Sequence, residues 1–367
     1  MTKVAIVGAG PAGSYCARLL AEQGFDVELF EEHKKIGLPV QCTGLVTKEL
    51  LELVGLGKFV VNELNRVKVV PPNGKATEIQ LKEFVIDRQK FDSELARQAI
   101  KAGAKLNLGC RFVGLKNGAI LLRQKNKIVR KKADIIIGAD GPLSAVAKAA
   151  GLWRDRKFYF GQQATVKGKF DARKFMTYFG KAAPDFFGWV VPESKSLARI
   201  GLASRSKARN LFGAFVKRFG GRLVARQAGL IPIYSPLQQI EVRKSGLKIY
   251  LLGDAAGFVK ATTGGGLIPG LKSAKILADC IAKGRSYHAA TRKLRMELLA
   301  HLLLRKTLNK FSEKDYATLA RLISGKRVKK ILESTTREEP IKIIAKLAMA
   351  EPRFFKFALN FLRSLGL

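Results

Sequence analysis

Three glycines near the start of the chain have the spacing that lets a backbone bind the pyrophosphate of a dinucleotide. Gly8, Gly10 and Gly13 lie between a short apolar run at 3–7 and a helical pattern that ends near Gln23. The first glycine allows a tight turn, the second lets phosphates approach the backbone, and the third allows close helix–strand packing. The start of the helix then presents N–H groups and a partial positive charge to the phosphates.

An acidic residue follows at the distance that such a site requires. Glu31 ends a second apolar run at 26–31, eighteen residues after Gly13. A carboxylate at this place accepts hydrogen bonds from the hydroxyl groups of a ribose. The motif and its acid indicate a dinucleotide-binding βαβ unit, but they do not distinguish FAD from NAD.

A second glycine-rich segment far along the chain favours FAD. Residues 253–257 (GDAAG) follow an apolar run at 248–252, and residues 263–267 (TGGGL) open a helical pattern. In FAD enzymes of this kind, the late Gly-Asp pair holds the ribityl chain and the next helix points its start at the flavin. We therefore expect the two glycine-rich segments to converge on a single flavin.

Two shorter segments suit a flavin site but also fit structural roles. Arg88 lies in 87–92 (DRQKFD), where it either hydrogen-bonds the flavin or its phosphates or is a surface residue beside a helix cap. Asp140 lies in 138–144 (GADGPLS), which resembles an Asp-Gly fingerprint of flavoprotein hydroxylases. Its carboxylate could equally cap the next helix. The sequence leaves both pairs of alternatives open.

A short strand with aromatic residues offers a face for an apolar ligand. In 184–192 (PDFFGWVVP), the period of two places Phe187, Trp189 and Val191 on one side. Such a face suits a long apolar chain, whose burial contributes about 25 cal/mol per Å². The alternative is that these side chains form the core of a sheet.

These segments require a nucleotide domain that another domain interrupts. Strand and helix patterns alternate up to about residue 152 and resume near 245, whereas short alternating strands with aromatics replace them in between. We expect an α/β fold in three parts. They are a discontinuous FAD-binding Rossmann domain (1–152 and 245–285), an antiparallel β substrate domain (153–244) and a basic helical C-terminal region (286–367).

The order of these segments resembles the flavoprotein hydroxylase superfamily, with its glutathione-reductase-like FAD domain and p-hydroxybenzoate hydroxylase-like fold. Two features narrow the resemblance to the geranylgeranyl reductase family, especially archaeal digeranylgeranylglycerophospholipid reductases. One is the loop 37–45 (GLPVQCTGL), in which the family has a cysteine beside the flavin ring. The other is the strand 184–192, which is similar to the family pattern PxxYxWxFP but has Phe187 for Tyr and Val191 for Phe. The hydroxyl group that the family's tyrosine would offer is therefore missing.

The resemblance implies FAD as the cofactor and an enzyme that saturates carbon–carbon double bonds of geranylgeranyl chains in isoprenoid lipids. It implies Phe187, Trp189 and Val191 as substrate-binding residues and Cys42 as the residue nearest the reacting centre, either as proton donor or as a shape element. No metal is expected. The implied FAD-binding residues, including the motif glycines, are Gly8, Gly10, Ala12, Gly13, Glu31, Cys42, Thr43, Leu45, Arg88, Phe112, Asp254, Gly266 and Leu267.

The chain is strongly basic, with 67 Lys and Arg against 29 Asp and Glu and a net charge of +38. Such a charge attracts polyanions, namely nucleic acid, anionic lipid headgroups or phosphorylated substrates, unless it reflects a basic bias of the whole organism. No zinc-finger, RNP-like or helix-turn-helix signature is present, so we expect no nucleic-acid partner.

An amphipathic stripe near the C-terminus fits a lipid surface, with core packing as the alternative. Its apolar side comprises Phe354, Phe355, Ala358, Leu359, Phe361, Leu362 and Leu365, with Lys356, Asn360 and Arg363 opposite.

The remaining expectations concern compartment, electron donor and rival functions. The four cysteines form no Cys-x-x-Cys pair and no apolar run reaches about 18 residues, which predicts a cytoplasmic protein, free or peripheral on the inner face of the cell membrane. The electron donor is NAD(P)H or ferredoxin, since a second complete glycine motif is absent.

One rival is an FAD-dependent monooxygenase that hydroxylates an aromatic or epoxidises a polyene, because the fold is shared. Another is a flavoprotein that only binds membrane or nucleic acid.

Overall fold

The computed structural model describes residues 1–206, 208–244 and 246–365. They form two compact units, each assembled from three stretches of chain. The first unit contains residues 1–40, 88–157 and 232–298. The second unit contains residues 41–87 and 158–231 and the chain from Leu299 onward.

A mainly parallel six-stranded sheet is the centre of the first unit. The central strands are buried on both faces, which is why they appear in the sequence as unbroken apolar runs. Only the edge strand β16 pairs antiparallel among the pairings described for this sheet. The strand order is β16 (Glu241–Lys244), β17 (Leu247–Leu251), β10 (Ile135–Gly138), β1 (Lys3–Val7), β2 (Asp26–Glu31) and β6 (Lys105–Leu108).

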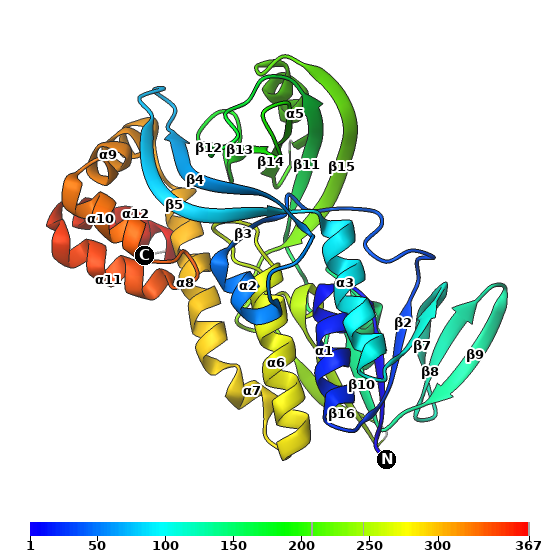
Figure 1. Ribbon diagram of the computed structural model, residues 1–367. Coiled ribbons are helices and arrows are strands. Elements are labelled where there is room, and N and C mark those ends of the chain that lie inside the picture. Colours follow the sequence, from blue (N-terminus) through cyan, green and yellow to red (C-terminus); the bar gives the residue numbers. More distant parts are fainter. Residues whose placement is uncertain (207, 245, 366–367) are drawn as a thin grey trace. The chain divides into compact units, whose positions relative to one another are not determined.

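Three helices pack side by side in this unit, with α1 in the middle (Figure 1). They are α1 (Pro11–Glu22), α3 (Arg88–Lys101) and α6 (Leu267–Lys283). The helix α4 (Ala145–Ala150) packs against β10 and β17. The unit also holds a three-stranded sheet of β7 (Cys110–Lys116), β8 (Ala119–Gln124) and β9 (Lys127–Lys132). Its two short helical segments are η1 (Gly253–Ala256) and α7 (Tyr287–Ala290).

The second unit is built on an eight-stranded, mostly antiparallel sheet. One of its faces packs against α5 (Ala208–Lys217) through residues such as Val190 and Phe215. The strand order is β15 (Arg222–Pro232), β11 (Phe158–Lys167), β14 (Leu197–Ser204), β13 (Gly188–Pro192), β12 (Lys174–Tyr178), β4 (Val60–Val70), β5 (Thr77–Ile86) and β3 (Leu45–Thr47), and α2 (Lys48–Val54) follows β3.

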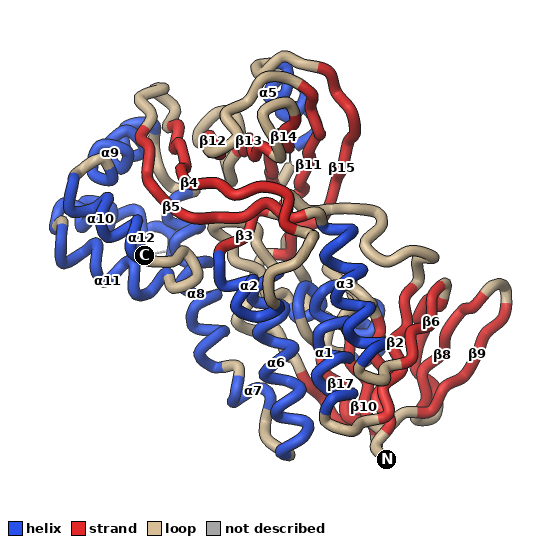
Figure 2. Tube along the Cα trace, in the orientation of Figure 1, coloured by secondary structure: helices blue, strands red, loops and turns tan. Residues whose placement is uncertain are grey.

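The C-terminal helices belong to this second unit. Helices α9 and α10 pack against β5, and Phe354 and Ile323 join an apolar cluster with Val191 of β13 (Figure 2). These elements are α8 (Arg292–Leu308), whose first turns belong to the first unit, α9 (Glu313–Ile323), α10 (Lys326–Ser334), α11 (Pro340–Ala350), η2 (Pro352–Phe357) and α12 (Ala358–Leu365). Among the described residues, no helix combines the length and the hydropathy that crossing a bilayer requires.

The two units differ from the predicted domain boundaries in one segment above all. Residues 41–87 were assigned to the FAD-binding domain, but they supply β3, β4 and β5 to the sheet of the second unit. The cause is a long-range pairing, because β4 joins that sheet by pairing in parallel with β12, more than a hundred residues later. Local residue patterns carry no information about such a partner.

The predicted amphipathic stripe near the C-terminus is also divided differently. Phe354 packs into the apolar cluster and Asn360 is buried, whereas Phe355 and Leu359 are exposed. The side chain of Leu365 lies outside the described residues. The segment begins with the 3₁₀ turns of η2 rather than with an α-helix, which changes the phase of the side chains along it.

Candidate active site

The first glycine motif forms the turn between β1 and α1. Gly8 has a φ of +100°, and a Cβ atom there would lie 2.3 Å from the carbonyl oxygen of Ala139. A Cβ atom on Gly13 would lie 2.0 Å from the oxygen of Gly8, so both positions require glycine. Around Gly10, by contrast, no described atom lies within 4 Å of a built Cβ atom. This space and the lack of a side-chain cap on α1 suit the approach of a phosphate.

The carboxylate of Glu31 is oriented beside this turn. One oxygen accepts a hydrogen bond from the Ala9 N–H at 2.9 Å, and the other accepts one from the His33 N–H at 3.0 Å. The second oxygen also lies 2.6 Å from Nδ1 of His33, a neighbour that was not predicted. Glu31 is the last residue of β2 and so lies at the carboxyl end of the strand, where open α/β sheets bind their ligands.

The two glycine-rich segments meet within the first unit. Cβ atoms built on Gly253 and Gly270 would lie 3.1 and 3.5 Å from the Cβ atom of Ala12, so α6 and η1 pack closely on the start of α1. A Cβ atom on Gly266 would lie 2.5 Å from Oδ1 of Asp254. The late Gly-Asp pair, the start of α6 and the first motif thus lie together, as expected of residues that hold one extended dinucleotide.

An unpredicted arginine holds the Gly-Asp turn. Arg156 is buried and donates hydrogen bonds to the carbonyl oxygens of Asp254, at 3.1 Å, and of Ala255. Burial lowers the pKa of Arg156 to about 10, and the carboxylates of Asp140 and Asp254 oppose that shift. Desolvation raises the pKa of Asp254 to about 6, although Arg88 and Arg156 lower it. Asp254 can therefore change its charge near neutral pH.

The structure shows which groups the residues of the two shorter segments contact. Arg88 begins α3, has a side chain 16% exposed and donates to both carboxylate oxygens of Asp92, at 2.9 and 2.8 Å. Its charge also acts on Asp254, which places it near the Gly-Asp turn. Asp140 accepts from the Val146 N–H at 3.0 Å and from Ser144, so it has the capping role at α4. Phe112 is buried in β7 of the three-stranded sheet.

Residues 41–45 of the cysteine loop, which include Cys42 and Thr43, belong to the second unit and are fixed by hydrogen bonds. The hydroxyl of Thr43 donates to Oε1 of Gln163 at 2.7 Å, and its carbonyl oxygen accepts from the buried guanidinium of Arg199. The Gly44 N–H donates to Sγ of Cys42 at 3.3 Å, and the Gly44 oxygen accepts from the Ile86 N–H at 2.8 Å. Cys42 and Thr43 are half-buried in this fixed loop.

The aromatic strand lies next to this loop in the same unit. The indole N–H of Trp189 donates to the same oxygen of Gln163 at 2.9 Å, and the Phe187 ring meets Trp189 edge-on with centroids 5.8 Å apart. Both rings are half-buried. Val191 is fully buried in the apolar cluster on which Leu45 and Trp189 also pack. Val191 is therefore a core residue, while the two aromatic rings keep accessible surface.

Another unpredicted arginine lies behind the aromatic rings. Arg305 of α8 is 1% exposed and lies over the rings of Phe186, at 4.6 Å, and Phe187, at 5.8 Å. It also donates to the Phe186 carbonyl oxygen at 3.3 Å. Burial lowers its pKa. The residue comes from the helical tail, where no motif marks it.

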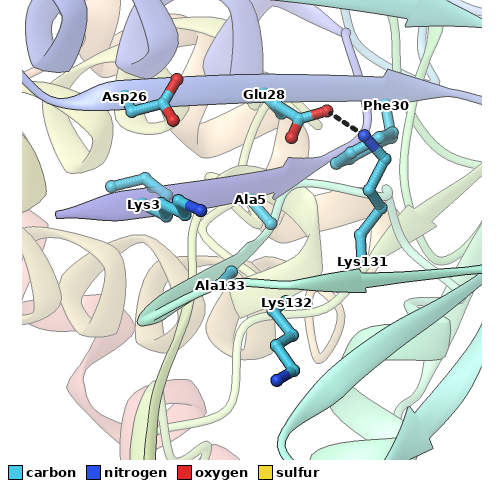
Figure 3. Close-up of a pocket in the computed structure, with 9 residues that line it drawn as sticks. Lys3, Ala5, Asp26, Glu28, Phe30, Lys131, Lys132 and Ala133 are labelled. Carbon is cyan, nitrogen blue, oxygen red and sulfur yellow. Dashed lines mark hydrogen bonds and ion pairs between the residues drawn. The ribbon is translucent and has the colours of Figure 1, made fainter. Parts of the chain in front are cut away.

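A small pocket in the first unit lies away from these residues (Figure 3). Its lining includes Lys3 and Asp26, the first residues of β1 and β2, and the ion pair of Glu28 and Lys131 at 3.0 Å. It is large enough for about one water molecule. Its lining contains no residue of either glycine-rich segment, so it is not the dinucleotide site.

Similarity to known proteins identifies the family. Residues 6–49 match the NAD(P)-binding Rossmann-like domain. The chain is 30% identical to digeranylgeranylglycerophospholipid reductase 1 of Methanopyrus kandleri over 300 residues, 75% of this chain and 79% of that one. It is 31% identical to digeranylgeranylglycerophospholipid reductase of Methanosarcina acetivorans over 307 residues, 75% of this chain and 74% of that one.

The chain belongs to the digeranylgeranylglycerophospholipid reductase family. It is an FAD-dependent oxidoreductase that acts on carbon–carbon double bonds, as the resemblance implied. The fold agrees with that of a geranylgeranyl bacteriochlorophyll reductase-like protein from Thermoplasma acidophilum, with a TM-score of 0.84 and 23% identity over 98% of this chain and 100% of that one. A flavin-dependent halogenase has the same fold, with a TM-score of 0.69 and 18% identity over 97% and 77% of the two chains. The predicted α/β flavoprotein architecture is confirmed.

Proposed function

We propose that this reductase saturates geranylgeranyl chains of an archaeal-type ether phospholipid. The supporting observation is the pair of half-buried aromatic rings of Phe187 and Trp189, which lie beside the cysteine loop through the Gln163 bridge to Thr43. An apolar face next to that loop suits a polyprenyl chain, because burying the chain removes a large apolar area from water. The names of the relatives give the lipid class.

Thirteen residues are proposed to hold FAD. The motif glycines and Ala12 receive the pyrophosphate, Glu31 the ribose, and Asp254 the ribityl chain. Arg88 and Phe112 make further contacts with FAD. The cysteine-loop residues Cys42, Thr43 and Leu45 contact the flavin ring. The complete set is Gly8, Gly10, Ala12, Gly13, Glu31, Cys42, Thr43, Leu45, Arg88, Phe112, Asp254, Gly266 and Leu267.

The proposed chemistry places little demand on polar catalysis. An isolated alkene offers no carbonyl to polarise, so the protein has to position it, exclude water and supply one proton. Reduced FAD, held by the residues named above, would be the source of the hydride that one carbon receives. The Cys42 thiol is proposed to give its proton to the other carbon. The thiolate that remains would accept the Gly44 N–H, which already points at Sγ, and would regain a proton from water.

Anaerobic incubation of the chemically reduced enzyme with a geranylgeranyl ether phospholipid tests this function. We expect the product mass to rise by two hydrogens for each bond reduced, with one equivalent of flavin oxidised per bond in a single turnover. Incorporation of oxygen into the product in air, without mass gain under anaerobic conditions, would support a monooxygenase instead. We propose NAD(P)H or reduced ferredoxin as the physiological donor, which bleaching of the flavin by each donor distinguishes.

An anionic membrane surface is the proposed partner of the C-terminal helices. Between residues 340 and 365, the only acid is Glu351, which is paired with Arg353 at 2.6 Å. The exposed apolar residues of this stretch include Met349 (76%), Phe355 (67%) and Leu359 (57%). Exposed apolar side chains beside cations are typical of helices that lie on an anionic bilayer. The cations are Lys342, Lys346, Arg353, Lys356 and Arg363.

A further inference from the structure

One buried amide connects the cysteine loop to the aromatic strand. Gln163 of β11 is 4% exposed. Its Oε1 atom accepts from the Thr43 hydroxyl at 2.7 Å and from the Trp189 indole at 2.9 Å, and its Nε2 atom donates to Oε1 of Gln227 at 3.0 Å. All three contacts lie within the second unit.

The chemistry of the partners fixes the direction of each hydrogen bond. An indole N–H only donates, so the atom of Gln163 that faces Trp189 has to be the oxygen. The Thr43 hydroxyl must then also donate to that oxygen, because two acceptors cannot form a hydrogen bond. This leaves the lone pairs of the Thr43 hydroxyl available, and a ligand can approach that hydroxyl only with a donor group.

We propose that Gln163 is a positioning residue that sets both the acceptor direction of the Thr43 hydroxyl and the tilt of the Trp189 ring. Gln163 thereby leaves the Thr43 hydroxyl oxygen as an acceptor for an N–H group of the flavin. It also holds the Trp189 ring in place beside the cysteine loop. This inference rests on the proposed function for the roles of Thr43 and Trp189. The bridge itself is independent of any ligand and can be tested without one.

The direct test replaces Gln163 with methionine, which keeps the volume and removes the amide. We expect Q163M to weaken FAD binding about tenfold and to raise KM for the geranylgeranyl lipid several-fold, since a buried hydrogen bond is lost on each side. T43V should reproduce mainly the first effect and W189F mainly the second. The matched control is Q162M, because Gln162 points to the other side of β11.

A ligand-free measurement separates the bridge from the proposed function. The chain has two tryptophans, so W153F leaves Trp189 as the only emitter. In FAD-free W153F protein, T43V should shift the Trp189 emission, and it should cause no further shift once Q163M is present. If T43V shifts the emission but leaves FAD affinity unchanged, the bridge stands and the proposed cofactor role of Thr43 fails.

Two results would overturn the inference. One is a Q163M protein with a lower Tm but with wild-type FAD affinity, KM and Trp189 emission, which would make Gln163 a stabilising core residue only. The other is an equal emission shift from T43V with and without Gln163. If Q163M does not fold, T43V in the W153F background still decides, because an unchanged Trp189 emission there would contradict the bridge.

Discussion

The dinucleotide turn of the first unit and the cysteine loop of the second unit are stabilised in opposite ways. The turn is a backbone structure, in which Gly8 and Gly13 provide space and main-chain N–H groups provide polarity. The loop is held largely by side chains, with Gln163 and Arg199 binding Thr43 from neighbouring strands in addition to one main-chain bond from Ile86 to Gly44. A site for an invariant group such as pyrophosphate can consist of main chain, whereas a site that has to distinguish between lipids needs side chains that can vary.

The largest effect is expected from removing the thiol of the loop. C42A should lower kcat by about 100-fold or more if the thiol is the proton donor, in the range found for general acids. FAD affinity should fall much less than kcat, because C42A removes only the Gly44 N–H bond to Sγ, while the bonds to Thr43 and to the Gly44 oxygen remain. Single-turnover oxidation of the flavin by lipid, followed at its absorbance maximum, gives the rate. A C42S enzyme as fast as wild type would assign Cys42 the role of a shape element.

The backbone character of the turn predicts a selective loss of cofactor. G10A adds a methyl group where no described atom lies within 4 Å, so the Tm of the FAD-free protein should not fall. The same methyl group occupies the space for phosphate, and FAD affinity should drop roughly 100-fold, since even a small steric displacement disrupts several N–H contacts. G213A, at another open glycine, is the control. A G10A protein that has a lower Tm but still binds FAD with wild-type affinity would contradict this interpretation of the turn.

The raised pKa of Asp254 predicts a pH-dependent affinity. Below the pKa of about 6, the carboxyl is protonated and loses acceptor capacity. Ribityl hydroxyls donate more strongly to the ionised form, so FAD should bind roughly tenfold more weakly at about pH 5 than at about pH 8. D254N should bind weakly at both values and lose this dependence. Equal pH dependence in wild type and D254N, measured by fluorescence titration, would place the titrating group elsewhere.

An effect of similar size is expected at the C-terminal helices. F355S/L359S should reduce binding to anionic liposomes by about tenfold, because two exposed apolar side chains no longer enter the interface. Added salt should weaken the wild-type binding, since each nearby Lys or Arg contributes about 1 kcal/mol. L237S, at another exposed leucine, is the control. Equal binding to neutral and anionic liposomes would exclude an electrostatic contribution.

The contrast between the two regions also explains what could be predicted from the sequence. The turn was predictable because its glycines and Glu31 are defined by local spacing. The neighbours of the cysteine loop were not, because Gln163 and Arg199 reach it through pairings between distant strands. A signal was nevertheless present, since a polar residue in an otherwise apolar strand requires a buried partner. Arg199 in 197–204 (LARIGLAS) has this character, whereas Arg305 lies in a basic helix where an arginine does not stand out.

One glycine of β14 has a consequence for the evolution of the aromatic face. Gly201 pairs with Trp189 across the two strands, and a Cβ atom there would lie 2.6 Å from the indole. The indole ring therefore packs directly on the main chain of Gly201, and a larger residue at 201 would displace the ring. The same Cβ atom would lie 2.6 Å from the carbonyl oxygen of Gln162, so glycine is required at 201 whatever residue occupies 189. A preference for isoprenoid chains of another width would therefore have to arise at 189 while 201 remains glycine.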